Sequence, residues 1–274
     1  MVSRITIFSL VKAFRVLELV SKSNSGYTLT ELVRYLKISM GAAQRITNTL
    51  LDLGYLYKEP KTKIFRLTPK FLSFGSAFLS QSEIRDITLQ FMRQLSEELD
   101  EVVNLGVMMN DEEIVYIDRI DNSSHIVSAN IRAGSRRPIH LNSIGKVILA
   151  HLPEPDQKRI LDNISFAKNP SKTFQNRKEL EEQLKVIRKQ GYSAGKSELY
   201  DDIYAIAVPL LNHHGVAVAG LNVVIPLSRA SKSEINNRYI PRLVEAGREA
   251  SEAFGNVTAS RPTKRKVVRK KKKG

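Results

Sequence analysis

The sequence YTLTELVRYLKISMGAAQRITNTLLDLGYLY, residues 27–57, holds two short amphipathic segments separated by a tight turn. Apolar residues of the first segment recur at helical spacing, at Leu29, Leu32, Val33 and Leu36. Thr28 precedes them and Glu31 follows three residues later, a capping box that predicts the start of a helix. After residues 37–40 a second helical series begins, with Ala43, Ile46, Leu50 and Leu53 on its buried side. Two short helices joined in this way form the helix-turn-helix pattern.

The outer face of the second predicted helix carries side chains that suit DNA. This face comprises Gly41, Gln44, Arg45, Asn48 and Asp52. Arginine bonds bidentately to guanine, and glutamine or asparagine to adenine. Small residues at the helix start, Gly41 and Ala42, allow close approach to the sugar-phosphate backbone. The alternative is a helical hairpin of another small domain, in which Gln44 and Arg45 are merely solvated.

The flanking segments complete a small domain. A helical stripe of apolar residues predicts a further helix over residues 5–20. Residues 55–57 and 64–68 are predicted strands around a charged turn, and Lys58, Lys61 and Lys63 are placed there to meet phosphate. An ordinary exposed hairpin is the alternative, but the neighbouring helices favour a wing. We therefore predict a winged helix-turn-helix DNA-binding domain over residues 1–68.

A different organisation follows this domain. Residues 69–81 are apolar almost all round and predict a linker helix, which a second domain or the same helix of another subunit must cover. The latter indicates a homodimer. Residues 82–255 are predicted as a mixed α/β effector-binding domain with an antiparallel sheet, so the overall fold class is α+β. Its predicted strands are 102–109, 114–120, 126–132, 203–211 and 216–225, and its predicted helices are 82–101, 147–152, 154–163, 176–190 and 232–254.

Residues 143–146 mark a second candidate site, where a predicted strand leads into a helix. Exposed backbone N–H groups and the positive end of the helix dipole suit a carboxylate there. Glycine-containing turns of this kind are common, so the pattern fits an ordinary turn equally well.

Charge is concentrated at the two ends of the chain. Of the formal net charge of +15, residues 1–68 carry +7 and residues 256–274 carry +9. The partner that meets both ends is therefore expected to be a polyanion such as double-stranded DNA. The basic tail, 256–274, is too poor in apolar residues to fold alone and is predicted to be disordered. It either solubilises the protein or adds non-specific attraction to phosphate.

Several function classes are disfavoured. The chain has no Cys, and no apolar run approaches the roughly 20 residues that cross a bilayer, so we expect a cytoplasmic protein with no membrane partner. Only three residues separate Gly191 from Gly195, one fewer than a phosphate-binding loop requires. The five His show no metal-binding spacing and no Ser-His-Asp set can be assembled. We expect no cofactor, no metal and no enzymatic activity.

Two longer segments are distinctive, namely GSRRPIHLNSIGKVILA at 134–150 and YAIAVPLLNHHGVAVAGLNVVIP at 204–226. Both resemble the isocitrate-lyase-regulator (IclR) family of bacterial transcription factors. The resemblance extends over residues 5–254 and is nearest to regulators of sugar-acid catabolism, of the 2-keto-3-deoxygluconate type, and of aromatic-acid catabolism. It implies a winged helix-turn-helix, a linker helix and a domain that binds a small organic-acid effector. It also implies a homodimer or a dimer of dimers.

The resemblance also implies site residues. Arg45 matches the family's usual arginine in the recognition helix, whereas Gly41-Ala42 and Gln44 replace a common Ser-Thr pair and Tyr, which implies an unusual target sequence. The effector loop matches Ser143 and Ile144, with Gly145 beside them, and their backbone amides would hold a carboxylate. Further pocket positions match Gly195, Ala205, Asn222 and Val224, where relatives often have Asp, Cys, Ser and Ser. These departures indicate an acid larger or more apolar than glyoxylate or pyruvate, or a lost effector response.

Together these observations predict a homodimer that binds a pseudo-palindromic operator and changes its DNA affinity when an acid binds. Two alternatives remain at this point. A metabolite-modifying enzyme with an attached DNA-binding domain would need a catalytic constellation that the sequence lacks. An architectural DNA binder would be indifferent to sequence and to metabolites.

Overall fold

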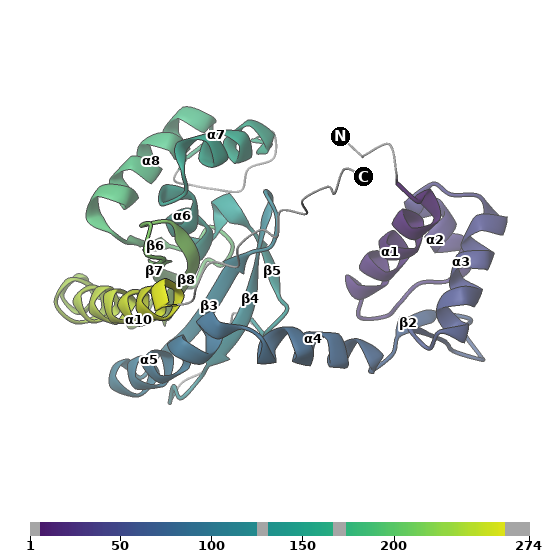
Figure 1. Ribbon diagram of the computed structural model, residues 1–274, viewed down its shortest axis with the longest axis horizontal. Coiled ribbons are helices and arrows are strands. Elements are labelled where there is room, and N and C mark those ends of the chain that lie inside the picture. Colours follow the sequence, from purple (N-terminus) through teal and green to yellow (C-terminus); the bar gives the residue numbers. More distant parts are fainter. Residues whose placement is uncertain (1–5, 125–130, 167–173, 261–274) are drawn as a thin grey trace, which may run out of the picture. The chain divides into compact units, whose positions relative to one another are not determined.

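The computed structural model describes residues 6–124, 131–166 and 174–260, and for 256–260 only the backbone. The chain divides into two compact units, Met1–Gln81 and Ser82–Gly274 (Figure 1). The expected strand over 126–132 lies largely outside the described residues, as does most of the basic tail. The expected disorder from residue 256 is wrong for its first residues, because the last helix continues to Ser260.

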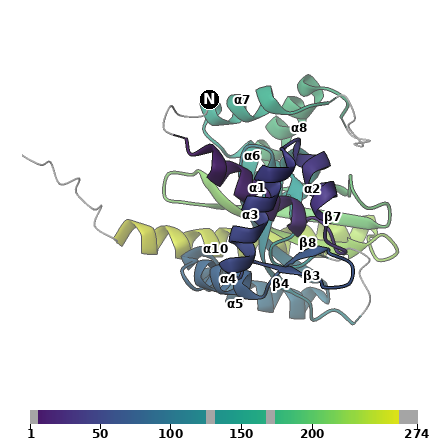
Figure 2. The ribbon, with the colours of Figure 1, turned by 90° about the vertical axis from the view of Figure 1, so that its right-hand side faces the viewer.

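The first unit is a winged helix, as predicted. Its elements are α1 (Phe8–Ser21), α2 (Leu29–Leu36), α3 (Met40–Asp52), β1 (Leu56–Lys58), β2 (Phe65–Leu67) and α4 (Lys70–Ser80). Figure 2 shows this unit from the side on which α1, α2 and α3 face the reader. The capping box forms, since the Thr28 N–H donates to Glu31 Oε2 at 2.7 Å and Thr28 Oγ1 accepts from the Glu31 N–H. Ser39 caps α3 by accepting from the Ala42 N–H at 3.3 Å. Local side chains therefore set where both helices begin.

A small apolar core joins the helices to the hairpin. Its buried members are Val16, Val20, Leu32, Leu50, Leu56 and Phe65. The two strands of the hairpin are antiparallel, with Leu56 opposite Leu67. The expected buried face of α3 needs one correction, because Leu53 is 53% exposed and Thr47 is buried instead. The Thr47 hydroxyl donates a hydrogen bond to the Ala43 carbonyl at 2.9 Å, so this buried polar side chain has a partner.

The second unit is built on one six-stranded antiparallel sheet of order β5-β4-β3-β8-β7-β6. The strands are β3 (Val102–Met108), β4 (Glu113–Ile120), β5 (Arg136–Pro138), β6 (Ser193–Lys196), β7 (Ile203–Leu211) and β8 (Ala217–Pro226). One face of the sheet is covered by α5 (Glu83–Leu99) and α10 (Ile240–Ser260), and the other by α6 (Ser143–Ala150) and α8 (Arg177–Gln190) with α7 (Glu154–Asn163) beside them (Figure 1). Burial on both faces explains why β7 and β8 are apolar almost throughout.

Three features of this unit differ from the sequence prediction. The edge strands β5 and β6 are too short to show an apolar alternation and were not expected. The single helix expected over 232–254 is divided into α9 (Lys232–Glu234), a π-helical turn (Ile235–Tyr239) and α10. Pro241 lacks the N–H that would continue the regular hydrogen-bond series, and the preceding Ile240 N–H donates five residues back, to Ile235. The apolar spacing predicts that Ile84, Ile87, Phe91, Leu95 and Leu99 face inward on α5, whereas the buried residues are Thr88, Met92, Leu95, Ser96 and Leu99.

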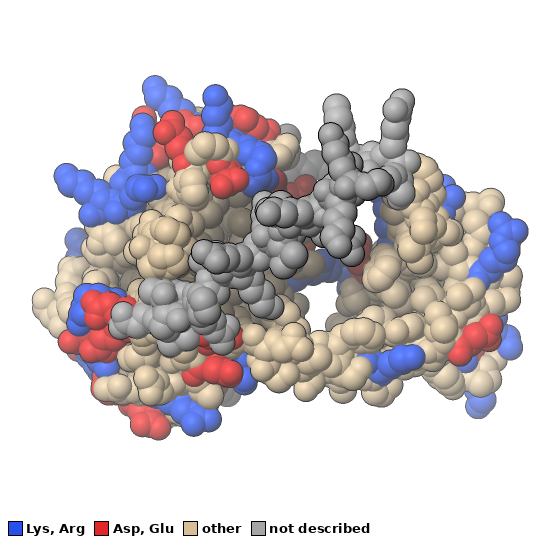
Figure 3. All heavy atoms as spheres, in the orientation of Figure 1, with Lys and Arg blue, Asp and Glu red and all other residues tan. Residues whose placement is uncertain are grey.

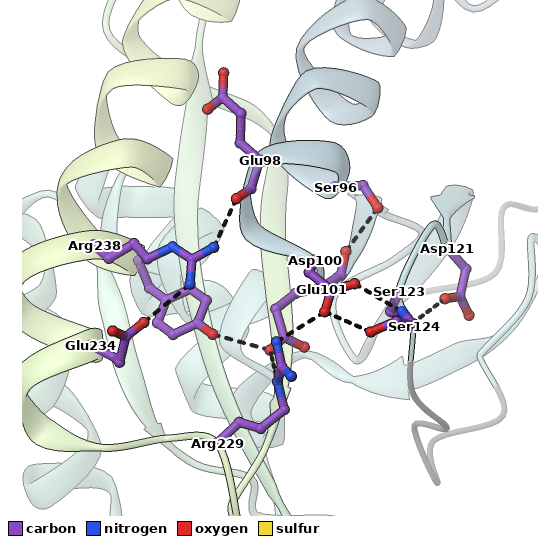
Figure 4. A network of polar contacts seen from close by, with 11 residues as sticks. Ser96, Glu98, Asp100, Glu101, Asp121, Ser123, Ser124, Arg229, Glu234 and Arg238 are labelled. Carbon is purple, nitrogen blue, oxygen red and sulfur yellow. Dashed lines mark hydrogen bonds and ion pairs between the residues drawn. The ribbon is translucent and has the colours of Figure 1, made fainter.

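A polar network fixes the end of α5 in the second unit (Figure 4). The buried carboxylate of Glu101 accepts from Arg229 Nε at 2.9 Å and from the Tyr239 hydroxyl at 3.1 Å. Asp100, in the left-handed conformation at φ 53°, accepts from Arg229 and from the backbone and side chain of Ser124. The hydrogen bond from Arg229 to Glu101 raises the pKa of Arg229. The network therefore joins α5, the loop after β4, the loop after β8 and the π-helical turn.

Candidate ligand cavity and DNA-contacting surface

The predicted DNA-contacting side chains of α3 lie in solvent. Gly41, Gln44, Arg45 and Asn48 are exposed, and Ala42 is half-buried at the start of the helix. Gln44 Nε2 donates to Asn48 Oδ1 at 3.3 Å, so the two amides lie side by side on the outer face. Arg45 forms no ion pair within the described residues. The face thus offers one guanidinium and two amides to a partner.

The hairpin places its three lysines differently. Lys61 and Lys63 are exposed in the turn, and Lys63 adopts the left-handed conformation at φ 58°. Lys58 is half-buried, and its Nζ lies 5.3 Å from the centroid of the Phe65 ring. Lys61 and Lys63 are therefore freer to reach a phosphate than Lys58.

A cavity of about 80 Å³ lies in the second unit, at the N-terminal end of α6. Since one water needs roughly 10–15 Å³ on this measure, the cavity admits a small organic molecule. Its wall combines polar and apolar side chains from α6, α8 and strands β4, β6, β7 and β8. The polar residues of the wall include Tyr116, Asn142, Ser143, Lys146, Lys196, Glu198, Tyr200 and Asn222, and the apolar ones include Leu141, Leu199, Ile203, Ala205 and Val224.

Five of the seven predicted effector-binding residues line this one cavity. They are Ser143, Gly195, Ala205, Asn222 and Val224. Strand register brings three of them together, because Ala205 is paired with Gly195 on one side and with Val224 on the other. Asn222 accepts from Asn104 Nδ2 at 2.9 Å and donates to Ser143 Oγ at 3.2 Å. Ser143 and Asn222, which are 79 positions apart, therefore share one wall.

The other two predicted residues, Ile144 and Gly145, do not line the cavity. Their N–H groups donate to Asn142 Oδ1 at 2.9 and 3.3 Å, because Asn142 is the N-cap of α6. The expectation that the Ile144 amide is available to a carboxylate is therefore corrected. Gly145 has a packing role, since a Cβ there would lie 1.9 Å from the carbonyl oxygen of Ile139.

Asn142 also orients a tyrosine that the sequence did not single out. Its Nδ2 donates to the hydroxyl of Tyr116 at 2.6 Å. Tyr116 is 1% exposed, and burial raises the pKa of its hydroxyl to about 12. Tyr116 is therefore a protonated, neutral member of the cavity wall. An asparagine directly before a helix was the only local signal for this pair.

A buried ion pair lies on the same wall. Lys146 Nζ is 2.9 Å from Glu198 Oε1, and the two side chains are 8% and 4% exposed. Burial lowers the pKa of Lys146, and the carboxylate of Glu198 opposes that shift. The residues are 52 positions apart, and sequence spacing alone could not connect them.

The mouth of the cavity carries a further cation. Lys196, on β6, is exposed, and no ion pair to it is found in the parts of the chain that the structure describes. Tyr200 lines the cavity and accepts from Arg137 Nη2, which brings a guanidinium close to the wall. With Lys146 balanced by Glu198, the excess charge of the lining is positive, which suits an anionic ligand.

Two features are absent from the described residues. Among them no group of three or more His, Cys, Asp or Glu could hold a metal ion. None of the helices within the described ranges is long and apolar enough to span a membrane.

Comparison with known proteins matches both units to one family. Residues 9–60 match the IclR helix-turn-helix domain, and residues 76–252 match the bacterial transcriptional regulator IclR C-terminal domain. The chain is 32% identical to the HTH-type transcriptional regulator KdgR of Dickeya chrysanthemi, over 91% of this chain and 81% of that protein. It is 27% identical to the Pca regulon regulatory protein of Pseudomonas putida, over 88% and 82% of the two chains. The fold also matches an IclR homolog from Microbacterium hydrocarbonoxydans solved in complex with 4-hydroxybenzoate, with a TM-score of 0.71 at 23% identity, covering 92% of this chain and all of that one.

Proposed function

This chain belongs to the IclR family of bacterial transcriptional regulators, with a helix-turn-helix DNA-binding domain and a C-terminal ligand-binding domain, and from that premise we propose how it works. A homodimer binds a specific operator through two copies of α3. An organic acid in the cavity beside α6 shifts the dimer between states of different DNA affinity. As a regulator of transcription it acts in the bacterial cytoplasm, and the regulator names of its relatives support a role without enzymatic activity.

The cavity beside α6 is the observation that supports binding of an effector. Ser143, Gly195, Ala205, Asn222 and Val224 converge there from four separate elements, beside an unbalanced lysine. Such convergence of a few polar groups on a partly apolar pocket is typical of small-molecule sites. An acid is the chemical class that a positive lining favours. The complex of a structural relative with 4-hydroxybenzoate supports the same class.

The DNA part is assigned to side chains that lie free in solvent. We propose that Arg45, Gln44 and Asn48 contact base edges in the major groove, while the small residues Gly41 and Ala42 admit the backbone. Lys61 and Lys63, with a smaller contribution from Lys58, contact phosphates and set the register.

A second copy of the chain is the proposed cover for the apolar surface of the first unit. On α4, Leu72, Phe74 and Phe78 are 74%, 56% and 55% exposed. Phe8, Leu10 and Phe14 of α1 are also exposed, and the surface over α4 is almost uncharged in Figure 3. Apolar patches of this kind mark interaction sites. A dimer through this surface would place two recognition helices on a pseudo-palindromic operator.

Selection of DNA fragments from the source genome by the full chain tests the proposal. We expect a small set of sites to be enriched, with inverted half-sites. Arg45→Ala should abolish the enrichment, whereas Lys185→Ala, a change of an exposed lysine on α8, should not. Uniform recovery of all fragments by the unaltered chain would contradict sequence-specific regulation and favour an architectural role.

A further inference from the structure

The N-terminal end of α6 is already occupied by a side chain of the protein. Asn142 Oδ1 accepts from the N–H groups of Ile144 and Gly145. A ligand carboxylate could take these two amides only by displacing the N-cap, which would destabilise the start of α6. The hydrogen-bond donors for an acid must therefore be sought elsewhere on the wall.

The same contact fixes the orientation of the Asn142 amide. Because its oxygen faces two N–H donors, its Nδ2 is the atom that points to Tyr116 and donates at 2.6 Å. The Tyr116 oxygen is thus the acceptor in this bond, and its own proton must point to another atom. Within the described residues no acceptor for that proton is found.

Tyr116 therefore presents an unused donor at a buried place. The residue is 1% exposed and lines the cavity, so neither bulk solvent nor another described residue satisfies the O–H group. A buried polar group without a partner is destabilising, and a ligand oxygen that accepts a hydrogen bond from it removes that penalty. A carboxylate is suited to this place because both of its oxygens accept hydrogen bonds and neither donates.

We infer that Tyr116 is the specificity-determining hydrogen-bond donor of the cavity, and that its hydroxyl donates to a carboxylate oxygen of the bound acid. Asn142 is a positioning residue that acts through Tyr116. This inference rests on the proposed function, in which an acid binds in the cavity. The family resemblance implies that the Ile144 amide holds the carboxylate, whereas the inference assigns that hydrogen bond to the Tyr116 side chain.

Two neighbouring groups support the assignment. The Ser143 oxygen accepts from Asn222 Nδ2, which leaves the Ser143 proton for a second ligand oxygen. Lys196 lines the same cavity and supplies positive charge, whereas the charge of Lys146 is balanced by Glu198. Burial raises the pKa of Tyr116 to about 12, so the hydroxyl remains a donor throughout the range in which carboxylic acids are ionised.

Direct binding to the full chain tests the inference. Calorimetric titrations with gluconate, benzoate and 4-hydroxybenzoate as probes are made on the unaltered protein, on Tyr116→Phe and on Tyr204→Phe. Tyr204 is a half-buried tyrosine of β7 that does not line the cavity, so it is the matched control. For a probe that binds, we expect Tyr116→Phe to raise the Kd about ten- to hundredfold, the worth of a hydrogen bond to a charged group, and Tyr204→Phe to change it less than about twofold.

A second variant tests whether Asn142 acts through Tyr116. Asn142→Asp keeps the N-cap oxygen but removes the donor, so the Tyr116 proton turns toward residue 142 and away from the ligand. In that background we expect Tyr116→Phe to leave the Kd unchanged. An equal Kd for the unaltered protein and Tyr116→Phe would overturn the inference while the proposed function stands. Failure of every acid to bind the unaltered protein would overturn both.

Discussion

The ammonium group of Lys146 lies 2.9 Å from the carboxylate of Glu198, and both side chains are almost completely buried beside the ligand cavity. Water is nearly excluded from this pair, so the attraction between the two charges is little screened. Removal of one partner from a buried pair is far more costly than replacement of both.

Lys146→Met is therefore expected to lower the free energy of unfolding by about 3–5 kcal/mol, because it leaves the Glu198 carboxylate without its cation. The double change Lys146→Met with Glu198→Leu should regain more than half of that loss. Urea denaturation of the three proteins measures both values. If the single and double variants lose the same amount, the pair is not the source of the effect.

Gly145→Ala should destabilise the second unit by about 1–3 kcal/mol, because the new Cβ would lie 1.9 Å from the Ile139 carbonyl and force the backbone apart. Gly195→Ala is the stability control, since a Cβ there meets nothing within 4 Å. Thermal unfolding of both variants checks this. Equal midpoints for the two would contradict a packing role for Gly145.

The capping box of α2 is expected to make the free energy of unfolding depend on pH. Hydrogen bonds from the backbone and side chain of Thr28 lower the pKa of Glu31 below 4.5. A lowered folded-state pKa means that the contribution of ionised Glu31 is complete above about pH 4.5 and is lost as the pH falls through the lower folded value. The stability difference between the unaltered protein and Glu31→Gln should therefore shrink between pH 5 and pH 3, as measured by urea unfolding at each pH. A difference that stays constant would show that the charge of Glu31 is not involved.

Removal of a lysine from the β1–β2 hairpin is expected to change how DNA affinity depends on salt. Lys61→Ala and Lys63→Ala should each weaken binding to all duplexes alike and reduce the log-log salt slope by about 0.9. Arg45→Ala should instead cost about 1–3 kcal/mol on the selected operator and little on scrambled duplex. Fluorescence anisotropy at several salt concentrations separates the two effects. Loss of sequence preference in the lysine variants would place base contacts in the wing.

Much of the fold could be predicted because its signals are local. Thr28 and Glu31 set the start of α2 within four residues, and the long apolar runs of β7 and β8 indicate strands buried on both faces. The apolar spacing does not reveal the division of the last helix, whose hydrogen-bond series is interrupted at Pro241. Edge strands such as β6 are too short for a period to be detected.

The cavity was only partly predictable. Ser143, Ala205 and Val224 came from the resemblance to a family, but the contacts that give the wall its polarity join distant residues. Tyr116 and Asn142 are 26 positions apart, and Lys146 and Glu198 are 52 apart, so no spacing rule links them. The N-cap role of Asn142 did have a local signal, because asparagine before a helix is typical of a cap. The same signal indicates that the Ile144 amide is already hydrogen-bonded to the cap.

The central claim is that acid binding and operator binding are coupled, and reciprocity tests it most directly. The affinity of the full chain for its selected operator is measured with and without a saturating probe acid, and the affinity for that acid is measured with and without operator. Our account predicts that both affinities change by one common factor, of about 5- to 150-fold. An operator affinity that is the same at zero and saturating acid would contradict it.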